Sequence, residues 1–169
     1  NQAKHICEIG ADVVEWRVDW FEEVKNYESV ENAAKQLRDI LGETPILFTF
    51  RTAKEGGERT IELDEYVELN EKIAKSGYVD IVDVEAFTGD TYVEKVIKTA
   101  HECGVKVIAS NHDFRKTPPK EELIARMRKM RELGADIPKI AVMPQSMEDL
   151  LTLLSATEEM RRCYADRPV

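Results

Sequence analysis

The chain has 169 residues, of which 43% are hydrophobic and 34% are charged, and its formal net charge is −9. These values predict one soluble globular domain, and no apolar run approaches the roughly 18 residues of a membrane span. The acidic balance argues against a nucleic-acid surface, which needs a basic stripe. The three cysteines lack CxxC spacing, which fits reduced thiols in a cytoplasm. No set of His, Cys, Asp or Glu has the spacing of a zinc site, so we expect no metal.

Strand-like and helix-like patterns alternate along the chain. Residues 1–9 resemble the end of a helix, and five apolar segments rich in Val, Ile and Phe then fit buried strands at 12–19, 45–51, 78–85, 106–114 and 137–143. Amphipathic patterns predict helices after them at 29–41, 60–76, 90–103, 117–133 and 146–163. Four of these helices are followed by a glycine, at 42, 77, 104 and 134. The alternation predicts parallel βα units.

Side-chain alternation within the strands separates two faces. In the first strand, Val14, Trp16 and Val18 alternate with Glu15, Arg17 and Asp19, and the other strands likewise have one apolar face and one face with polar groups. An open sheet covered by helices on both sides would be apolar on both faces. The pattern therefore favours a (β/α)8 TIM barrel, whose site lies at the C-terminal mouth of the strands.

A barrel of eight units typically needs about 250 residues. We therefore expect residues 1–169 to be a single domain that forms an incomplete portion of a barrel, with about five parallel strands and five to six helices. The first strand and the last two strand-helix units would lie outside this sequence. Five strands alone would expose apolar edges, so further residues or another copy of the chain would have to cover them.

The polar face collects a candidate site from all five strands, consisting of Glu15, Arg17, Arg51, Glu85, His112 and Lys139. Each residue also has a structural interpretation. Glu15 and Arg17 could form an ion pair, Glu85 could face a helix, His112 could be a hydrogen-bonded core histidine, and Lys139 could extend to water from an edge strand. The cations predict an anionic ligand, and a guanidinium fits a carboxylate particularly well.

Lys139 stands among apolar residues in the segment 138–144, PKIAVMP. Burial favours the neutral form of a lysine, and a neutral amine can form a Schiff base with a ketone. The imine makes the adjacent C–H acidic, and His112, one strand away, is the best candidate base. The resulting enamine could lose a β-hydroxyl or attack a second carbonyl. Residue types therefore leave dehydration and aldol chemistry open.

Four segments resemble the type I 3-dehydroquinate dehydratase family in order and spacing: EWRVD at 15–19, FTFRTAKEGG at 48–57, SNHDF at 110–114 and PKIAVMP at 138–144. The resemblance implies a lyase of the shikimate pathway that converts 3-dehydroquinate, a carboxylated cyclic ketone, to 3-dehydroshikimate by syn elimination of water. It further implies no metal or organic cofactor and a homodimer.

The resemblance also implies roles for individual residues. Lys139 would carry the Schiff base, His112 would act as general acid and base, and Glu55, in the loop after the second strand, would orient His112. Three further residues, Glu15, Arg17 and Arg51, would bind the substrate. Family members continue through two more strands and a closing loop that supplies an arginine, a serine and a glutamine, none of which maps onto this sequence.

Two other functions stay open at this point. One is a class I aldolase barrel, which would use the same lysine with two carbonyl partners. The other is a non-catalytic barrel fragment that folds by association.

Overall fold

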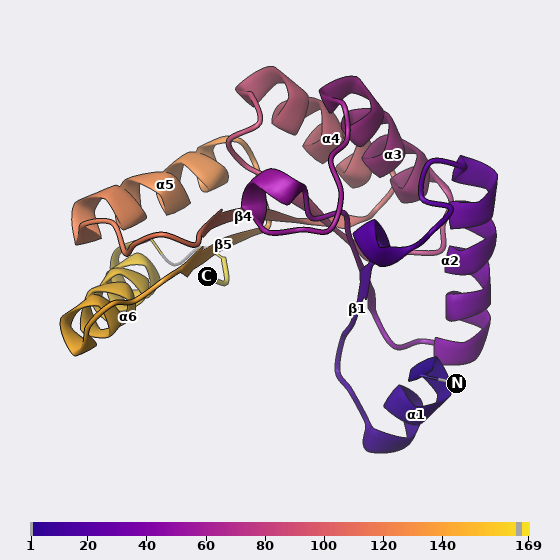
Figure 1. Ribbon diagram of the computed structural model, residues 1–169, viewed down its shortest axis with the longest axis horizontal. Coiled ribbons are helices and arrows are strands. Elements are labelled where there is room, and N and C mark those ends of the chain that lie inside the picture. The colour runs from indigo at the N-terminus through magenta and orange to yellow at the C-terminus, as the bar shows by residue number, and fades with distance from the viewer. Residues whose placement is uncertain (1, 165–166) are drawn as a thin grey trace.

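The structure is a computed structural model that describes residues 2–164 and 167–169 (Figure 1). The helices are α1 (Gln2–Ile9), α2 (Tyr27–Leu41), α3 (Leu63–Lys75), α4 (Asp90–Glu102), α5 (Lys120–Glu132) and α6 (Met147–Cys163). The strands are β1 (Val14–Arg17), β2 (Ile46–Thr49), β3 (Ile81–Glu85), β4 (Lys106–Asp113) and β5 (Ile137–Val142). Two short 3-10 helices, η1 (Val18–Trp20) and η2 (Ala53–Glu55), follow β1 and β2.

The five strands form one parallel sheet in the order β1-β2-β3-β4-β5. Figure 1 shows helices α2, α3, α4 and α5 following one another in an arc along one side of the sheet. Each strand therefore pairs with the next one in the chain after a helical crossover, which is the repeat of a (β/α) barrel. The predicted α/β class and the five parallel strands are confirmed. That the rest of a barrel completes this sheet stays a prediction.

The apolar face of the strands is the core, as the alternation predicts. Eight of its residues are at most 1% exposed: Val18, Ile46, Phe48, Phe50, Val82, Val84, Val107 and Ala109. Trp16 adds edge-to-face contacts with Phe48 and Phe21, at centroid distances of 5.6 and 5.9 Å. Polar residues on the opposite face are buried as well, among them Thr49, Asp83 and Ser110, each 0% exposed. Buried polar groups need partners, so this face must be held by a hydrogen-bond network.

Most element ends agree with the sequence prediction. Each of the four glycines expected to end a helix has a positive φ. The helix expected from Thr117 instead begins at Lys120, after an extended Pro119. The proline pair explains the difference, because a residue that precedes a proline is pushed away from helical geometry, and Pro118 precedes Pro119. The first strand ends at Arg17, two residues early, because the chain turns into η1.

Three features of the described residues bear on the expectations from composition. No helix there is long and apolar enough to cross a membrane. Cys103 and Cys163 are free and exposed, whereas the side chain of Cys7 lies outside the described part of the chain. No three His, Cys, Asp or Glu side chains in this part are grouped so that they could hold a metal ion.

Asp136 joins β4 to the segment that leads into β5, at the N-terminal end of the sheet. Its carboxylate accepts hydrogen bonds from the backbone N–H of Val107 at 2.9 Å, from Lys106 Nζ at 2.9 Å and from the His101 ring at 2.8 Å. Burial raises the pKa of Asp136, but these three hydrogen bonds outweigh it and the net pKa lies below the ordinary 3.8. The ionised carboxylate therefore stabilises the fold.

We expect Asp136→Asn to destabilise the protein by about 1 kcal/mol near neutral pH, because the amide loses charge-assisted hydrogen bonds. A carboxyl with a lowered folded pKa stabilises fully above its unfolded pKa, and this stabilisation is lost as the pH falls through the folded pKa. The difference in unfolding free energy between the variant and the native protein should therefore shrink as the pH falls below 3.8, the ordinary pKa of an aspartate. Urea unfolding across this range measures it, with Glu102→Gln as the surface control. A gap independent of pH would contradict this account.

Candidate active site

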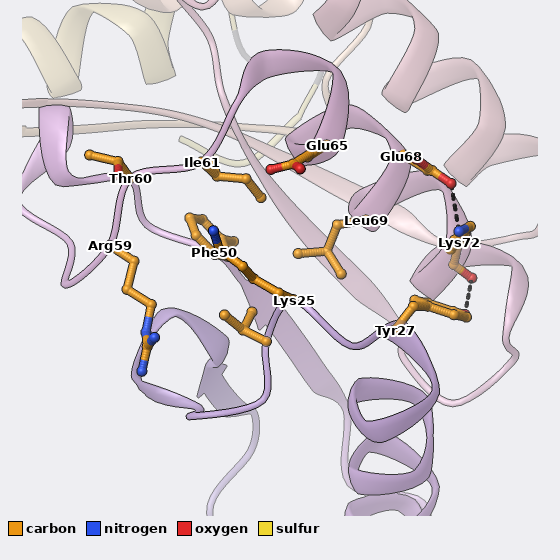
Figure 2. Close-up of a pocket in the computed structure, with 11 residues that line it drawn as sticks. Lys25, Tyr27, Phe50, Arg59, Thr60, Ile61, Glu65, Glu68, Leu69 and Lys72 are labelled. Atoms are coloured by element: carbon orange, nitrogen blue, oxygen red, sulfur yellow. Dashed lines mark hydrogen bonds and ion pairs between the residues drawn. The ribbon is translucent and has the colours of Figure 1, made fainter.

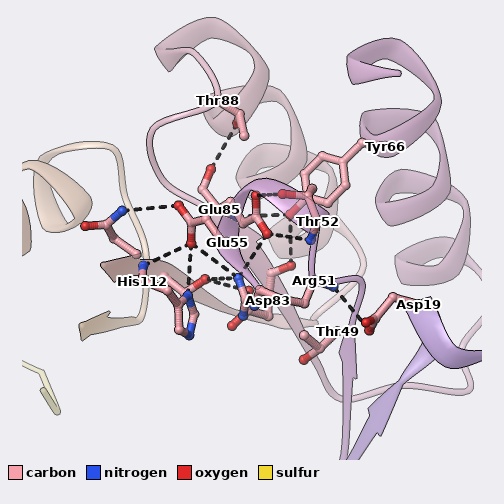
Figure 3. A network of polar contacts seen from close by, with 12 residues as sticks. Asp19, Thr49, Arg51, Thr52, Glu55, Tyr66, Asp83, Glu85, Thr88 and His112 are labelled. Atoms are coloured by element: carbon pink, nitrogen blue, oxygen red, sulfur yellow. Dashed lines mark hydrogen bonds and ion pairs between the residues drawn. The ribbon is translucent and has the colours of Figure 1, made fainter. Parts of the chain in front are cut away.

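The polar side chains of the sheet gather where the strands end at their C-terminal edge. Figure 3 shows a continuous network there that includes Arg51, Glu55, Glu85 and His112. These residues come from β3, β4 and the segment after β2, so the structure brings together four of the predicted site residues. The network has three parts: a buried cation, a loop tied at both ends, and a histidine paired with a carboxylate.

Arg51 is the buried cation, only 4% exposed. Its Nη2 donates to Asp83 at 2.8 Å, and its Nη1 donates to Ser110 Oγ at 2.8 Å and to Glu85 at 3.3 Å. Burial lowers the pKa of Arg51, but the facing carboxylates Asp83 and Glu85 raise it above its ordinary value. The guanidinium thus links β3 and β4 to the end of β2 and offsets two buried negative charges.

Glu85 fixes the start of the segment that carries η2. It is 2% exposed and accepts hydrogen bonds from the Thr52 N–H at 2.8 Å and the Thr52 hydroxyl at 2.7 Å. Burial raises the pKa of Glu85, and its hydrogen bonds with Thr52 and the charge of Arg51 counteract this only in part. The carboxylate therefore anchors Thr52 at the C-terminal edge of the sheet, and the Glu85 N–H also donates to the Tyr66 hydroxyl of helix α3 at 3.0 Å.

Asp19 holds the far end of the same segment. It is 0% exposed, and its carboxylate accepts from the Glu58 N–H at 3.0 Å and from the Arg51 N–H at 3.4 Å. Two further hydrogen bonds, both 2.7 Å, come from Arg17. Burial raises the pKa of Asp19, but the hydrogen bonds from Arg17 and Glu58 bring it below its ordinary value. Alternation placed Asp19 on this face, but no sequence pattern indicated this anchoring role.

The alternative of an ion pair between Glu15 and Arg17 is wrong. Arg17 forms its bidentate pair with Asp19, and this hydrogen bond raises the pKa of Arg17. Glu15 is exposed and accepts a hydrogen bond from the Thr49 hydroxyl at 2.8 Å. The Arg17 side chain is 36% exposed at the end of β1, so it stays accessible to a ligand.

Two adjacent glycines let the loop pass close to its neighbours. Gly56 has φ +83°, and a Cβ there would lie 2.4 Å from the Phe114 ring. A Cβ on Gly57 would lie 1.8 Å from the Arg51 carbonyl oxygen. The Phe114 ring in turn stacks on His112 with an interplanar angle of 11° and a centroid distance of 6.1 Å. The glycine pair is thus the sequence signal for a loop packed against the site.

Glu55, at the end of η2, binds His112 at two points. Its Oε2 lies 2.9 Å from His112 Nδ1 and accepts the His112 N–H at 3.0 Å. A carboxylate only accepts hydrogen bonds, so Nδ1 carries the proton and, in the neutral ring, Nε2 is left as the free base. The side chain of His112 is 10% exposed and that of Glu55 is 12% exposed. Strand alternation did not locate Glu55, because it lies in a loop.

Lys139 lies on β5, the strand next to His112. Its Cα pairs with that of Ser110, two residues before His112 in β4, so alternation places Lys139 on the same face as His112. The residue is half-buried. Within the described part of the chain, the structure gives Lys139 no hydrogen-bond or ion-pair partner. A partly buried amine without a carboxylate partner is suited to nucleophilic chemistry.

Several hollows lie near this region, and two of them help to place the site. One, of ≈ 440 Å³, borders His112 and Phe114 and opens beside the Glu55–His112 pair. The other, of ≈ 190 Å³, is shown in Figure 2 and is lined by Phe50, Leu69 and Ile61. Phe50 belongs to the helix-covered face of the sheet, opposite Arg51, so the second hollow lies behind the site. The lining of the first hollow also includes Asn111 and Arg126 of helix α5 but not Lys139, so this hollow borders only the His112 side of the site.

A family model, Type I 3-dehydroquinase, matches residues 1–169. The chain belongs to the type I 3-dehydroquinase family. The 3-dehydroquinate dehydratase of Clostridioides difficile strain 630 is 51% identical over 169 residues, and that of Escherichia coli O9:H4 strain HS is 56% identical. A crystal structure of type I 3-dehydroquinate dehydratase from Clostridium difficile, with covalent modified comenic acid, has a TM-score of 0.97 over 99% of this chain at 51% identity.

These type I 3-dehydroquinases are longer than this chain. The 169 residues cover 66% of the C. difficile protein, 67% of the E. coli protein and 66% of the chain in the crystal structure. The chain thus spans about two thirds of the relatives that it matches along its whole length.

We expect Arg51→Met to destabilise the fold by about 3–5 kcal/mol, because it leaves Asp83 and Glu85 as buried carboxylates without their cation. The pKa of Glu85, already raised by burial, should rise further in the variant. A raised folded pKa favours the fold at low pH and disfavours it as the pH rises through that value, so the deficit should shrink on acidification.

Chemical unfolding at neutral and mildly acidic pH measures this effect. The control is Arg162→Met, which removes an exposed pair with Glu158 and should change stability little. Equal effects of the two substitutions would contradict a structural role for the buried Arg51 cation.

Proposed function

We propose that this protein is a 3-dehydroquinate dehydratase, a hydro-lyase that forms 3-dehydroshikimate by syn elimination of water through a Schiff base on Lys139. The observation that carries the proposal is the contact of 2.9 Å between Glu55 and His112 Nδ1, on the strand next to the half-buried Lys139. Membership of the family and the covalent ligand in the C. difficile structure support the same chemistry. Among the residues that the structure describes, no specific contact favours the aldolase alternative.

Lys139 begins the reaction as the nucleophile. Its neutral Nζ attacks the carbonyl carbon of the substrate, and the carbonyl oxygen leaves as water after accepting protons, which gives a protonated imine. The positive nitrogen draws electrons from the adjacent carbon and acidifies its C–H. Residues that fix the ketone against Nζ turn this attack into an intramolecular step.

His112 then moves the protons. Its free Nε2 takes the proton from the adjacent carbon, and the electron pair forms an enamine. The enamine expels the β-hydroxyl, which leaves as water with a proton returned from His112. A water molecule finally hydrolyses the imine, which restores the Lys139 amine and releases the unsaturated ketone. Glu55 holds the Nδ1–H throughout and stabilises the imidazolium that forms transiently.

Arg17, Glu15 and Arg51 surround the substrate in this proposal. Arg17 is partly exposed and would pair with the carboxylate, and the exposed Glu15 would accept hydrogen bonds from hydroxyl groups. Arg51 is committed to its protein partners, so its main contribution is to offset the charges of Asp83 and Glu85 near an anionic substrate. We further propose a cytoplasmic homodimer that needs no metal or organic cofactor, and size-exclusion chromatography tests the dimer.

Lys139→Ala should abolish the covalent adduct that borohydride traps when 3-dehydroquinate is present, because the variant lacks the amine that forms the imine. Intact mass and peptide mapping detect the reduced adduct. The matched control is Lys54→Ala, since Lys54 is an exposed lysine in η2, the turn that also carries Glu55. An adduct that maps to another residue of the native protein, or no adduct at all, would refute the proposal.

His112→Ala should lower kcat by about 10²–10⁴-fold, the typical effect of losing a general base, while an imine still forms on Lys139. Steady-state rates and borohydride trapping separate the two effects. His101→Ala provides the comparison, because that histidine lies at the opposite end of the sheet next to Asp136 and should leave kcat unchanged. Full activity of His112→Ala would rule out the proton-transfer role.

A further inference from the structure

The side chain of Asn111 connects the catalytic pair to helix α5. Its Nδ2 donates to Glu55 Oε1 at 3.1 Å, and its Oδ1 accepts from Arg126 Nη1 at 2.8 Å. The orientation of the amide follows from its partners, because a guanidinium only donates and a carboxylate only accepts. Both ends of the Asn111 amide are therefore committed, one to the site and one to a cation on α5.

Asn111 completes the hydrogen bonding of the Glu55 carboxylate. Oε2 accepts the two N–H groups of His112, whereas Oε1 accepts from Asn111. The last torsion of a glutamate is broad, so a carboxylate held at one oxygen only could rotate away. A donor at each oxygen fixes the plane of the carboxylate and keeps Oε2 aimed at His112 Nδ1.

The strand itself does not need this amide. Asn111 pairs with Ile140 through the backbone ladder between β4 and β5, and its side chain takes no part in that ladder. Arg126 has a second partner on its own helix, Glu122, so the cation would be paired without Asn111. The link from Arg126 through Asn111 to Glu55 therefore acts mainly on the position of the carboxylate.

We propose that Asn111 is a positioning residue for the dehydration, which fixes Glu55 and thereby holds His112 with its proton on Nδ1 and Nε2 free as the base. Arg126 strengthens the link, because a cation that donates to the amide oxygen polarises the amide N–H toward Glu55. The catalytic part of this inference rests on the proposed function, whereas the tautomer of His112 is a property of the protein alone.

The test compares Asn111→Leu and Asn111→Asp with the native protein by 15N NMR of the histidine rings. In the native protein, neutral His112 should be the Nδ1–H tautomer. Asn111→Leu keeps similar volume but lacks both hydrogen bonds, so the Nε2–H tautomer should become populated. Asn111→Asp places an acceptor against Glu55 and should displace the carboxylate further. In both variants kcat should fall about tenfold, the effect of one hydrogen bond to a charged group, with KM nearly unchanged.

Control variants separate positioning from folding. Arg126→Met should produce a weaker shift in the same direction, whereas Glu122→Gln leaves the bond from Arg126 to Asn111 in place and should change neither the tautomer nor kcat. If Asn111→Leu fails to fold, Asn111→Asp and Arg126→Met decide the question. A native Nδ1–H tautomer in every folded Asn111 and Arg126 variant would overturn the proposal. If borohydride trapped no adduct of 3-dehydroquinate on the native protein, the proposed function would be refuted, but the result on the His112 tautomer would stand.

Discussion

The buried guanidinium of Arg51 is the interaction on which the polar face of the sheet depends. It binds Asp83, Glu85 and Ser110, and so connects the segment after β2 to β3 and β4 with one cation. The apolar face could form from hydrophobic burial alone, but two carboxylates on the opposite face could not stay buried without a charge partner. Because Arg51 offsets the negative charge of Glu85, this carboxylate can stay buried and hold Thr52, where the loop begins.

The contacts around Arg51 in turn position the loop that carries Glu55. Asp19 and Glu85 hold the two ends of the loop, and the adjacent glycines let it pack against Phe114. A loop held in this way can deliver Glu55 to His112 with little freedom left to lose on substrate binding. Mobile loops often carry catalytic groups, but here the surrounding contacts make the loop part of the rigid scaffold. Proton transfer by a histidine depends on such fixed geometry, because the ring must present one particular nitrogen.

Much of the fold could be predicted from the sequence, because hydrophobic periodicity indicates which face of an element is buried and glycines indicate where helices end. The five strands, their apolar face and the helix-ending glycines are confirmed, and alternation placed Lys139 on the same side as His112. Alternation could not locate Glu55, since it lies in a loop, and the resemblance to a family supplied its role. The partners of Arg51 and the two contacts of Asn111 depend on strand register and on long side chains that meet across 15 or more residues. Composition and spacing carry no information about such long-range side-chain contacts. That further residues or another copy of the chain complete the barrel stays a prediction.

In the proposed reaction, Lys139 and His112 act on one ketone, and Glu55 holds the ring of His112. A crystal structure of the borohydride-reduced complex with 3-dehydroquinate tests it most directly. Continuous density is expected from Lys139 Nζ to the substrate, with His112 Nε2 within hydrogen-bond reach of the reacting carbon or its leaving hydroxyl and Nδ1 still on Glu55. Substrate density attached elsewhere, or a His112 ring turned away from the adduct, would contradict it.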